Sequence, residues 1–395
     1  MSRSRRRRTQ VIIIGAGPAG LLLAQVLHEA AIESVVLEKH ARAHVEGRIR
    51  AGILERGTVE MLGRAKADAR LKREALSHDG IEIAFAGQRQ RIDFKALAGA
   101  LVTVYGQSEL TKDLADRRAE IGGETVYGAD EVALGDLCSS RPAVSYMKDG
   151  QAYELSADFI AGCDGFHGVS RPSIPLDALR IYERAYPFAW LGVMVDAPPP
   201  ADVLLYARHA RGFALCSMRS RIRGRHYLQV GPETELDQWT PERIFEEIAV
   251  RIGDDGRTEL KQGPLLEKSL TTMRSFVCET MRFGRLFLVG DAAHIVPPTG
   301  AKGLNLAAGD VHYLSEALME FYRHGETSGL DAYEGRALRR VWKAQRFSQW
   351  MTALLHDFAA VDAFQDRIHR AELDYVLSSK SALASLAENY VGLPY

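Results

Sequence analysis

Cysteine is scarce in this sequence, which excludes two common kinds of stabilising site. The 395 residues include only four cysteines, and these form no Cys-x-x-Cys pair. A disulfide framework is typical of short, cysteine-dense chains, and a structural zinc site uses closely spaced ligand pairs. We therefore expect neither a disulfide framework nor a bound metal from Cys138, Cys163, Cys216 and Cys278.

An excess of charge of one sign is also missing. Lys and Arg number 50 against 51 Asp and Glu, so the formal net charge is −1. A protein that coats nucleic acid or an anionic membrane needs a basic excess, so we expect neither as a partner. Any anion must be bound locally. Hydrophobic residues make up 46%, which excludes disorder for the body of a chain long enough for two or three domains.

Only one long apolar run occurs, at residues 11–27, after the basic residues Arg3 and 5–8. This order resembles a signal peptide or a membrane anchor. Gly15, Gly17, Pro18 and Gly20 interrupt the run, however, and no small-residue cleavage site precedes a fresh domain start. We therefore favour a buried first strand behind a disordered basic tail at residues 1–8, in a cytoplasmic protein without membrane contact.

The interrupting glycines belong to a predicted β-α-β unit, with elements at residues 9–14, 21–31 and 34–37. In the string Gly-x-Gly-x-x-Gly, Gly15 permits a tight turn, Gly17 lets the backbone approach a pyrophosphate, and Gly20 allows close helix–strand packing. Glu38 follows Gly20 by 18 residues, where a carboxylate accepts hydrogen bonds from ribose hydroxyls. A glycine turn in another α/β unit is the alternative, and the context favours a dinucleotide site.

A second motif follows a predicted strand at residues 286–289. Gly290-Asp291 stands at the carboxyl end of that strand, where Asp291 can bind a second ribose-like hydroxyl. The loop at residues 297–303 then leads into a helix from Leu304, whose free N–H groups favour an electron-rich group such as the N1–C2=O edge of a reduced flavin. A plain loop with a capping Asp is the alternative. With no second Gly-x-Gly-x-x-Gly, the two motifs together predict FAD rather than NAD.

A possible substrate strand lies at residues 211–220. At period two, Phe213, Leu215, Ser217 and Arg219 share one face. A hydroxyl and a guanidinium on an apolar face suit a carboxylate, because Arg gives a two-pronged, charge-assisted grip. From the residues alone, a structural Arg paired with a protein carboxylate is as good an interpretation.

Longer strings add a family resemblance. GRIRAG at residues 47–52, VYGQ at 104–107, CDGFHG at 163–168, RGFALCS at 211–217, residues 290–305 and AENYVGLPY at 387–395 resemble the single-component FAD-dependent aromatic hydroxylases, and among them those that act on 4-hydroxybenzoate. The resemblance runs from about Thr9 to Tyr395. It implies an α/β, Rossmann-like FAD-binding fold with an inserted β-sheet substrate domain and a C-terminal helical region. We expect an FAD-binding domain at residues 9–180, a substrate domain at 181–285, and an FAD-contacting and helical interface region at 286–395.

The resemblance also implies the cofactor and substrate residues. The expected FAD contacts are Gly15, Gly17, Gly20, Glu38, Arg48, Arg50, Gln107, Asp164, Arg225, Asp291, Leu304 and Asn305, and Arg225 accompanies an outward swing of the flavin. The expected substrate contacts are Ser217, Arg219 and Tyr227 at the carboxylate, Tyr206 and Tyr390 at the phenol, and Pro298 and Thr299 along the ring. Taken alone, each Tyr would more often be a packed core aromatic.

The implied reaction is hydroxylation of 4-hydroxybenzoate to 3,4-dihydroxybenzoate, with O2 and NAD(P)H, through a C4a-hydroperoxyflavin. The substrate must lose its phenol proton, and Tyr206, Tyr390 and His78 form the implied relay, since a histidine pKa near 6.5 suits exchange with water. His78 lies in a Ser-His-Asp-Gly string, so a surface histidine in a turn is the alternative.

The resemblance implies a transient nicotinamide cofactor without a domain of its own, in contact with His167, Arg171 and Arg274. After Glu38 the chain carries Lys39, His40, Arg42 and His44, where NADPH-preferring members have Arg, Gln and Tyr at the first, second and last of these. Cationic side chains can still hold a 2′-phosphate, so we expect NADPH rather than NADH. The resemblance also favours a homodimer, although the apolar residues between 342 and 355 could equally be core.

Two rival functions stay open at this point. The same chemistry could act on a related phenolic acid, including the conversion of 3,4-dihydroxybenzoate to gallate, or the protein could be a flavin reductase. In a different class, a nucleic-acid-associated factor would use Arg3 and residues 5–8, and would be colourless with salt-dependent DNA affinity.

Overall fold

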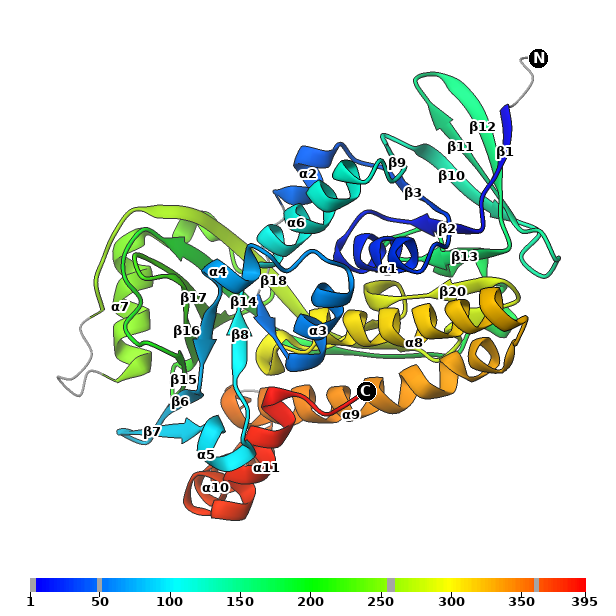
Figure 1. Ribbon diagram of the computed structural model, residues 1–395. Coiled ribbons are helices and arrows are strands. Elements are labelled where there is room, and N and C mark those ends of the chain that lie inside the picture. The colour runs from blue at the N-terminus through cyan, green and yellow to red at the C-terminus, as the bar shows by residue number, and fades with distance from the viewer. Residues whose placement is uncertain (1–4, 48–51, 254–259, 359–361) are drawn as a thin grey trace.

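A computed structural model describes residues 5–47, 52–253, 260–358 and 362–395 (Figure 1). The N-terminal β-α-β unit is confirmed as β2 (Val11–Ile14), α1 (Pro18–Glu29) and β3 (Ser34–Glu38). These strands belong to a six-stranded sheet of order β19-β20-β13-β2-β3-β9. The sheet is parallel except for β19, and its other strands are β9 (Thr125–Tyr127), β13 (Phe159–Gly162), β19 (Arg282–Phe283) and β20 (Leu286–Leu288).

Helices cover this sheet because its strands are apolar on both faces. All four residues of β2 are buried, and α1 packs against α6 (Gln107–Glu120) and α8 (Gly303–His324). Smaller elements bridge toward the second sheet: α2 (Arg42–Glu46), β4 (Ile53–Leu54), α3 (Arg56–Arg64), α4 (Leu71–Glu74), β5 (Leu76–His78), α5 (Phe94–Ala98) and β8 (Val102–Val104). β4, β8 and β5 form a three-stranded sheet of their own.

The region expected to form the substrate domain contains most of an eight-stranded sheet of order β21-β18-β14-β17-β16-β15-β6-β7, which we call the substrate sheet after that expectation. Its central strands are β14 (Ile181–Val195), β15 (Leu204–His209), β16 (Gly212–Ser220), β17 (Arg223–Val230) and β18 (Leu265–Cys278), with β21 (His294–Ile295) at one edge. The expected boundary at residues 181–285 is too narrow. β6 (Gly80–Phe85) pairs in parallel with β15, and β7 (Gln88–Asp93) forms the other edge.

The two faces of this sheet bury different cores. Ala214 and Cys216 face the cluster that α7 (Pro241–Ile252) covers, while Phe213 and Leu215 face a second cluster with Tyr206 and Tyr390. Helix α7 was not expected within the strand-rich region. Thr240 caps it by accepting a hydrogen bond from the backbone of Arg243, a common helix start.

The C-terminal region is helical, as expected from residue 304, and divides into four helices. α8 is followed by α9 (Ser328–Leu355), α10 (Ala363–Ser378) and α11 (Lys380–Val391). In Figure 1, α10 and α11 lie beneath the substrate sheet, beside β7 and α5. Tyr390 on α11 stacks on Phe94 of α5, with ring centroids 4.9 Å apart, so the end of the chain closes the second cluster. Within the described ranges, no helix is long and apolar enough to cross a membrane.

The expected disordered tail at residues 1–8 is wrong from Arg5 onward. β1 (Arg5–Arg8) pairs in parallel with β12 (Gln151–Ser156), in a sheet completed by β11 (Ala143–Lys148) and β10 (Asp130–Gly135). Arg7 forms a two-pronged ion pair with Glu124, with N–O distances of 2.7 and 2.6 Å. Backbone pairing and these charge contacts order the segment, and neither is visible in a run of arginines.

This anchoring predicts a small effect on stability. The Arg7 and Arg8 side chains are 52% and 57% exposed and pair with Glu124 and Asp158. Exposed ion pairs contribute about 1 kcal/mol or less each, so Arg7→Ala with Arg8→Ala should leave flavin content unchanged and lower the free energy of unfolding by at most about 2 kcal/mol. Urea unfolding and the flavin-to-protein absorbance ratio measure this. A loss of bound flavin would contradict it.

Candidate active site

The glycine loop has the shape that a pyrophosphate needs. Gly15 adopts φ +100°, and a Cβ there would lie 2.5 Å from the carbonyl oxygen of Cys163. A Cβ on Gly20 would lie 2.0 Å from the Gly15 oxygen, so neither position accepts a side chain. Gly17 differs, since a Cβ there would meet nothing within 4 Å. Open space therefore lies at the N-terminus of α1, where free N–H groups favour an anion.

Two carboxylates flank this loop. Glu38 is buried and accepts hydrogen bonds from the backbone N–H groups of Ala16 and His40, both at 2.8 Å. Asp164 accepts at Oδ2 from the N–H and hydroxyl of Ser170, at 2.8 and 2.9 Å. Its Oδ1 is buried without a partner, and burial raises the pKa of this carboxyl. A buried carboxylate oxygen with no donor is the kind of group that a cofactor hydroxyl satisfies.

The N-terminus of α8 forms the third side of the candidate cofactor site. Leu304 and Asn305 lie in its first turn, where backbone N–H groups have no acceptor within the helix. The Asn305 side chain is fully used by the protein. It accepts from the Glu55 N–H and the Thr58 hydroxyl, and donates to the carbonyls of residues 53 and 301. Only the backbone N–H of Asn305 is therefore left for the expected flavin contact.

The remaining expected FAD residues fall into three groups. Gln107 is the first residue of α6, and Asp291 follows β20. Arg225 is buried on β17, where it pairs with Glu267 at 3.0 Å and donates to Ser269 at 2.9 Å. Arg48 and Arg50 lie outside the described residues. The glycine loop, the unpaired Asp164 oxygen and the start of α8 together fit a dinucleotide with an electron-rich ring at its end.

A pair of tyrosines forms the polar end of the second cluster. The hydroxyls of Tyr206 and Tyr390 lie 2.7 Å apart, and Tyr206 also donates to the Thr299 carbonyl at 3.2 Å. Both rings are fully buried, and burial raises the pKa of both hydroxyls. The Thr299 side chain is held by Thr352 at 2.9 Å, so η5 (Pro298–Gly300) is fixed beside the pair. Buried hydroxyls in contact can pass a proton between them.

Strand β16 carries Ser217 and Arg219, the carboxylate clamp expected to bind the substrate carboxylate, and the strand departs at one point from regular pairing. Its pairing with β17 shifts register between Met218 and Ser220, which places Arg219 at an irregularity. The Arg219 Nε is buried without a hydrogen-bond partner, and no carboxylate of the described chain forms an ion pair with it. The alternative of a structural Arg is therefore not supported. Ser217 is buried, and Tyr227 lies half-buried on β17 with its ring 4.9 Å from that of Trp190.

His78 is not the surface residue of the alternative interpretation. Its side chain is 3% exposed at the end of β5, and neither ring nitrogen has a hydrogen-bond partner. Burial lowers the pKa of this imidazole, and Arg91 lowers it further, against Asp79 and Asp202. No direct hydrogen bond joins His78 to Tyr390, so a relay between them needs an intermediate group such as water.

The expected nicotinamide contacts gather around one aromatic ring. The guanidinium groups of Arg171 and Arg274 both lie 4.7 Å from the ring centre of Phe166, and the His167 ring lies 4.9 Å from it. Phe166 was missed as a functional candidate, although it lies inside the CDGFHG string. At the segment expected to hold the 2′-phosphate of NADPH, the rings of His40 and His44 lie 4.2 Å apart, and the neighbouring Lys39 is exposed.

Sequence reasoning also missed a buried charge network. Lys302 donates to Glu55 at 2.6 Å and to the Tyr390 carbonyl at 2.9 Å. Arg340 binds the other Glu55 oxygen at 2.7 Å and the Leu393 carbonyl at 2.6 Å. These residues lie 247 and 285 positions from Glu55, and no local pattern connects them. The network ties the start of α8 to α9, α11 and the end of the chain.

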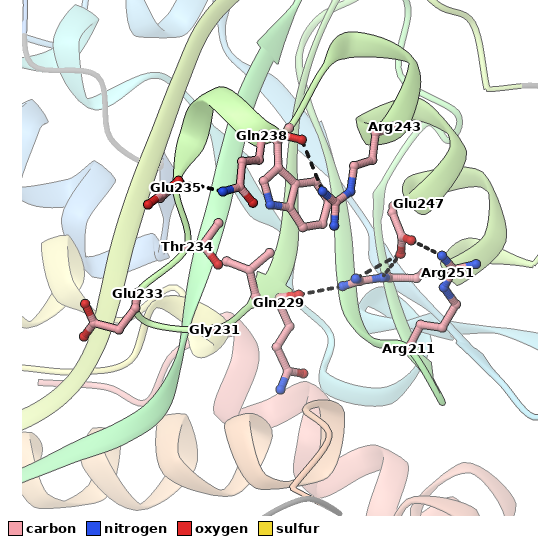
Figure 2. Close-up of a pocket in the computed structure, with 12 residues that line it drawn as sticks. Arg211, Gln229, Gly231, Glu233, Thr234, Glu235, Gln238, Arg243, Glu247 and Arg251 are labelled. Atoms are coloured by element: carbon pink, nitrogen blue, oxygen red, sulfur yellow. Dashed lines mark hydrogen bonds and ion pairs between the residues drawn. The ribbon is translucent and has the colours of Figure 1, made fainter.

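One cavity in the described part of the chain lies away from these residues. It measures about 510 Å³ and opens on the α7 side of the substrate sheet (Figure 2). Its arginines are already occupied. Glu247 accepts from Arg211 and Arg251, and Arg243 stacks on Trp239 with its guanidinium 4.2 Å from the ring centre. We assign no catalytic role to this cavity, because neither the tyrosine pair, Tyr206 and Tyr390, nor Arg219 lines it.

Comparisons with known proteins agree with this geometry. The model of the FAD binding domain family matches residues 8–348. The chain is 51% identical over 389 residues to a p-hydroxybenzoate hydroxylase of Acinetobacter baylyi, covering 98% of this chain and 96% of that protein. A 3-(3-hydroxy-phenyl)propionate/3-hydroxycinnamic acid hydroxylase of Burkholderia cenocepacia is 27% identical over 80% of this chain and 58% of its own length.

Solved structures agree on the fold. The crystal structure of p-nitrophenol 4-monooxygenase from Pseudomonas putida superposes with a TM-score of 0.83 at 18% identity, covering 98% of this chain and all of that one. A flavin-dependent monooxygenase in complex with FAD and substrate gives a TM-score of 0.75 at 20% identity, over 98% of this chain and 74% of the other. At these identities the likeness concerns the fold alone.

Proposed function

The chain belongs to the p-hydroxybenzoate hydroxylases within the FAD binding domain family, and from this premise we propose that it converts 4-hydroxybenzoate to 3,4-dihydroxybenzoate with O2 and NAD(P)H. It is an FAD-dependent aromatic hydroxylase. The observation that carries the substrate proposal is the buried hydroxyl pair of Tyr206 and Tyr390, 2.7 Å apart. A phenol hydroxyl beside Tyr206 would extend this chain of hydrogen bonds.

The protein's task is to bind the substrate by its two ends. Arg219, with its buried unpaired Nε, and Ser217 hold the carboxylate, and Tyr227 closes that end. Tyr206 Oη accepts the substrate phenol proton and passes its own to Tyr390. Tyr390 passes its own proton in turn through an intermediate group such as water to His78, which exchanges it with solvent. Pro298 and Thr299 lie along the ring. Bound FAD supplies the redox chemistry that activates oxygen, and the start of α8 stabilises negative charge on its ring.

We propose the remaining site roles on the same premise. Gly15, Gly17, Gly20, Glu38, Asp164 and Asp291 hold the dinucleotide, with Gln107, Arg225, Leu304 and Asn305 nearer its ring. His167, Arg171 and Arg274 receive the nicotinamide cofactor around Phe166. Supporting this, Arg171 is held by the carbonyls of Phe166 and Ala292 at 2.6 and 2.8 Å.

The decisive assay uses the purified yellow protein. Oxidation of NAD(P)H should rise sharply when 4-hydroxybenzoate is added, and the product should be 3,4-dihydroxybenzoate. Offering 3,4-dihydroxybenzoate as substrate tests the alternative of gallate formation. A colourless protein with salt-dependent DNA affinity would instead support the nucleic-acid alternative.

The choice of nicotinamide cofactor gives a prediction. Lys39 is exposed beside His40 and His44, whose rings are in tilted contact, while Arg42 is engaged by Glu46 and Asp116. A charge-assisted contact to a 2′-phosphate contributes about 1.5–3 kcal/mol, so kcat/KM should be about 10- to 150-fold higher for NADPH than for NADH. Initial rates with both cofactors measure this. Lys39→Met should lower only the NADPH value, and a clear NADH preference would contradict the proposal.

We also propose a cytoplasmic homodimer. Of the apolar residues between 342 and 355, Phe347, Met351, Leu354 and Leu355 are buried in the chain's own core, and Trp342 is 39% exposed. Support for a partner surface comes instead from α10, where Phe364, Ile368 and Tyr375 are exposed. Light scattering of the holoenzyme measures the mass directly, and a monomer at working concentration would contradict the proposal.

A further inference from the structure

A second cavity lies between α8, α9 and the end of the chain. It measures about 290 Å³, near the lower limit of the ~300–1,000 Å³ usual for small-molecule sites. We call it the α9 pocket. Its charged side chains are one carboxylate, Glu55, and five cations: Lys302, Arg336, Arg339, Arg340 and Lys343.

The carboxylates near the α9 pocket do not balance these cations. Glu55 is shared between Lys302 and Arg340, at 2.6 and 2.7 Å. Glu316 lies 3.7 Å from Arg336, and no carboxylate of the described residues pairs with Arg339 or Lys343. Unlike the arginines of the larger cavity, these cations leave a surplus of positive charge, and a concave surface with such a surplus attracts anions.

The arrangement of the cations favours an extended organic anion. Residues 336, 339, 340 and 343 follow one face of α9, over roughly 10 Å at 1.5 Å per residue. Leu306, Ala344, Phe347, Leu393 and Pro394 supply apolar wall between them. One polar group of the lining, the Arg340 Nε, is buried without a partner. Separated cations with apolar surface between them fit two carboxylates joined by a short carbon chain, and fit a compact ion such as phosphate less well.

The α9 pocket contacts the proton relay through Lys302. The Lys302 Nζ donates to the Tyr390 carbonyl at 2.9 Å and lies 5.9 Å from the centre of the Tyr390 ring. Its positive charge therefore favours negative charge at the tyrosine pair and at a phenolate beside it. An anion bound in the pocket would offset part of the Lys302 charge, and would therefore oppose this effect.

We propose that the α9 pocket binds a small organic dicarboxylate, and that its occupation disfavours the phenolate form of substrate at the Tyr206–Tyr390 pair. The second half rests on the proposed function, whereas the first does not. No covalent step is involved. The enzyme would thus slow when dicarboxylates accumulate, without any competition for the substrate carboxylate at Arg219.

The binding half is tested by calorimetric titration of the holoenzyme, without substrate, at constant ionic strength. Adipate, hexanoate and inorganic phosphate are the probes. We expect saturable adipate binding that is at least about tenfold tighter than that of the other two. Arg339→Ala with Lys343→Ala should weaken it at least about tenfold, since both residues are exposed and neither belongs to the catalytic machinery. Arg367→Ala with Lys380→Ala, which removes two exposed cations outside the pocket, should change it less than about twofold.

Three results would overturn the proposal: no saturable binding, equal losses in the two double variants, or phosphate binding as tight as adipate. The coupling is tested separately, from the absorbance of 4-hydroxybenzoate bound to the holoenzyme at the pH of half-ionisation. Saturating adipate should lower the phenolate fraction by about half, and the pocket variant should lose this response. An unchanged fraction with intact adipate binding overturns the coupling alone. Failure of the substrate to bind at all would count against the proposed function instead.

Discussion

Replacing Arg219 with alanine is expected to weaken the binding of 4-hydroxybenzoate by about 2–5 kcal/mol, roughly 30- to several-thousand-fold in Kd. The guanidinium lies at the register shift of β16, its Nε is buried without a partner, and no protein carboxylate of the described chain shares it. A substrate carboxylate would therefore be its counter-ion. Truncation leaves that carboxylate buried without its charged donor, which is the costly outcome. Titration of the change in flavin absorbance on substrate addition measures Kd directly.

Two controls separate this role from a structural one. Arg223→Ala removes a nearby arginine that is 47% exposed and pairs with Asp196, at 3.2 Å, and it should leave Kd within about twofold. Arg219→Lys keeps the charge but loses the two-pronged geometry, so its Kd should fall between the wild type and alanine. Phenol, which lacks the carboxylate, should bind the wild type and Arg219→Ala equally. If Arg219→Ala retained the wild-type Kd with normal flavin content, the carboxylate clamp would be wrong.

Local patterns in the sequence predicted the parts of the fold that local physics determines. Gly20 is required by its close approach to the Gly15 carbonyl within one β-α-β unit, so this part of the pattern is visible in a short window. Gly15 is required by an approach to the distant Cys163 carbonyl, whereas Gly17 has open space beside it. The assignment of β6 to the substrate sheet is different. Ile81 to Phe85 pair with residues 204–208. The alternation of apolar and polar residues along a strand predicts that one of its faces is buried, but it does not predict which distant strand it pairs with.

The candidate site shows the same division. The clamp on β16 could be proposed because Ser217 and Arg219 are two residues apart, although the register shift that places Arg219 could not. Tyr206 and Tyr390 are 184 positions apart, and only the family resemblance brought them together before the structure did. The Glu55–Lys302–Arg340 network and the α9 pocket were missed entirely, because each charged residue alone is typical of a solvated surface.

The tyrosine pair is where the largest effect on the reaction itself is expected. Tyr206 has two polar neighbours, the Tyr390 hydroxyl at 2.7 Å and the Thr299 carbonyl at 3.2 Å. The carbonyl only accepts hydrogen bonds, so Tyr390 is the one neighbour of the two that can also move a proton onward. Burial raises the pKa of the Tyr206 hydroxyl, so Tyr206 can transfer the substrate proton only by giving its own proton to Tyr390 in the same step.

Tyr206→Phe should therefore leave substrate binding and flavin reduction by NAD(P)H largely intact, while the rate of product formation falls about 10²- to 10⁴-fold, the usual contribution of a positioned acid or base. The oxygen consumed without product should leave as hydrogen peroxide, which a peroxidase-linked assay quantifies beside chromatography of 3,4-dihydroxybenzoate. Tyr186→Phe is the matched control, since that hydroxyl pairs with Ser275 at 3.1 Å outside the relay. It should stay coupled. Full coupling in Tyr206→Phe would mean that the phenol proton leaves by another route, and the relay through Tyr390 and His78 would have to be abandoned.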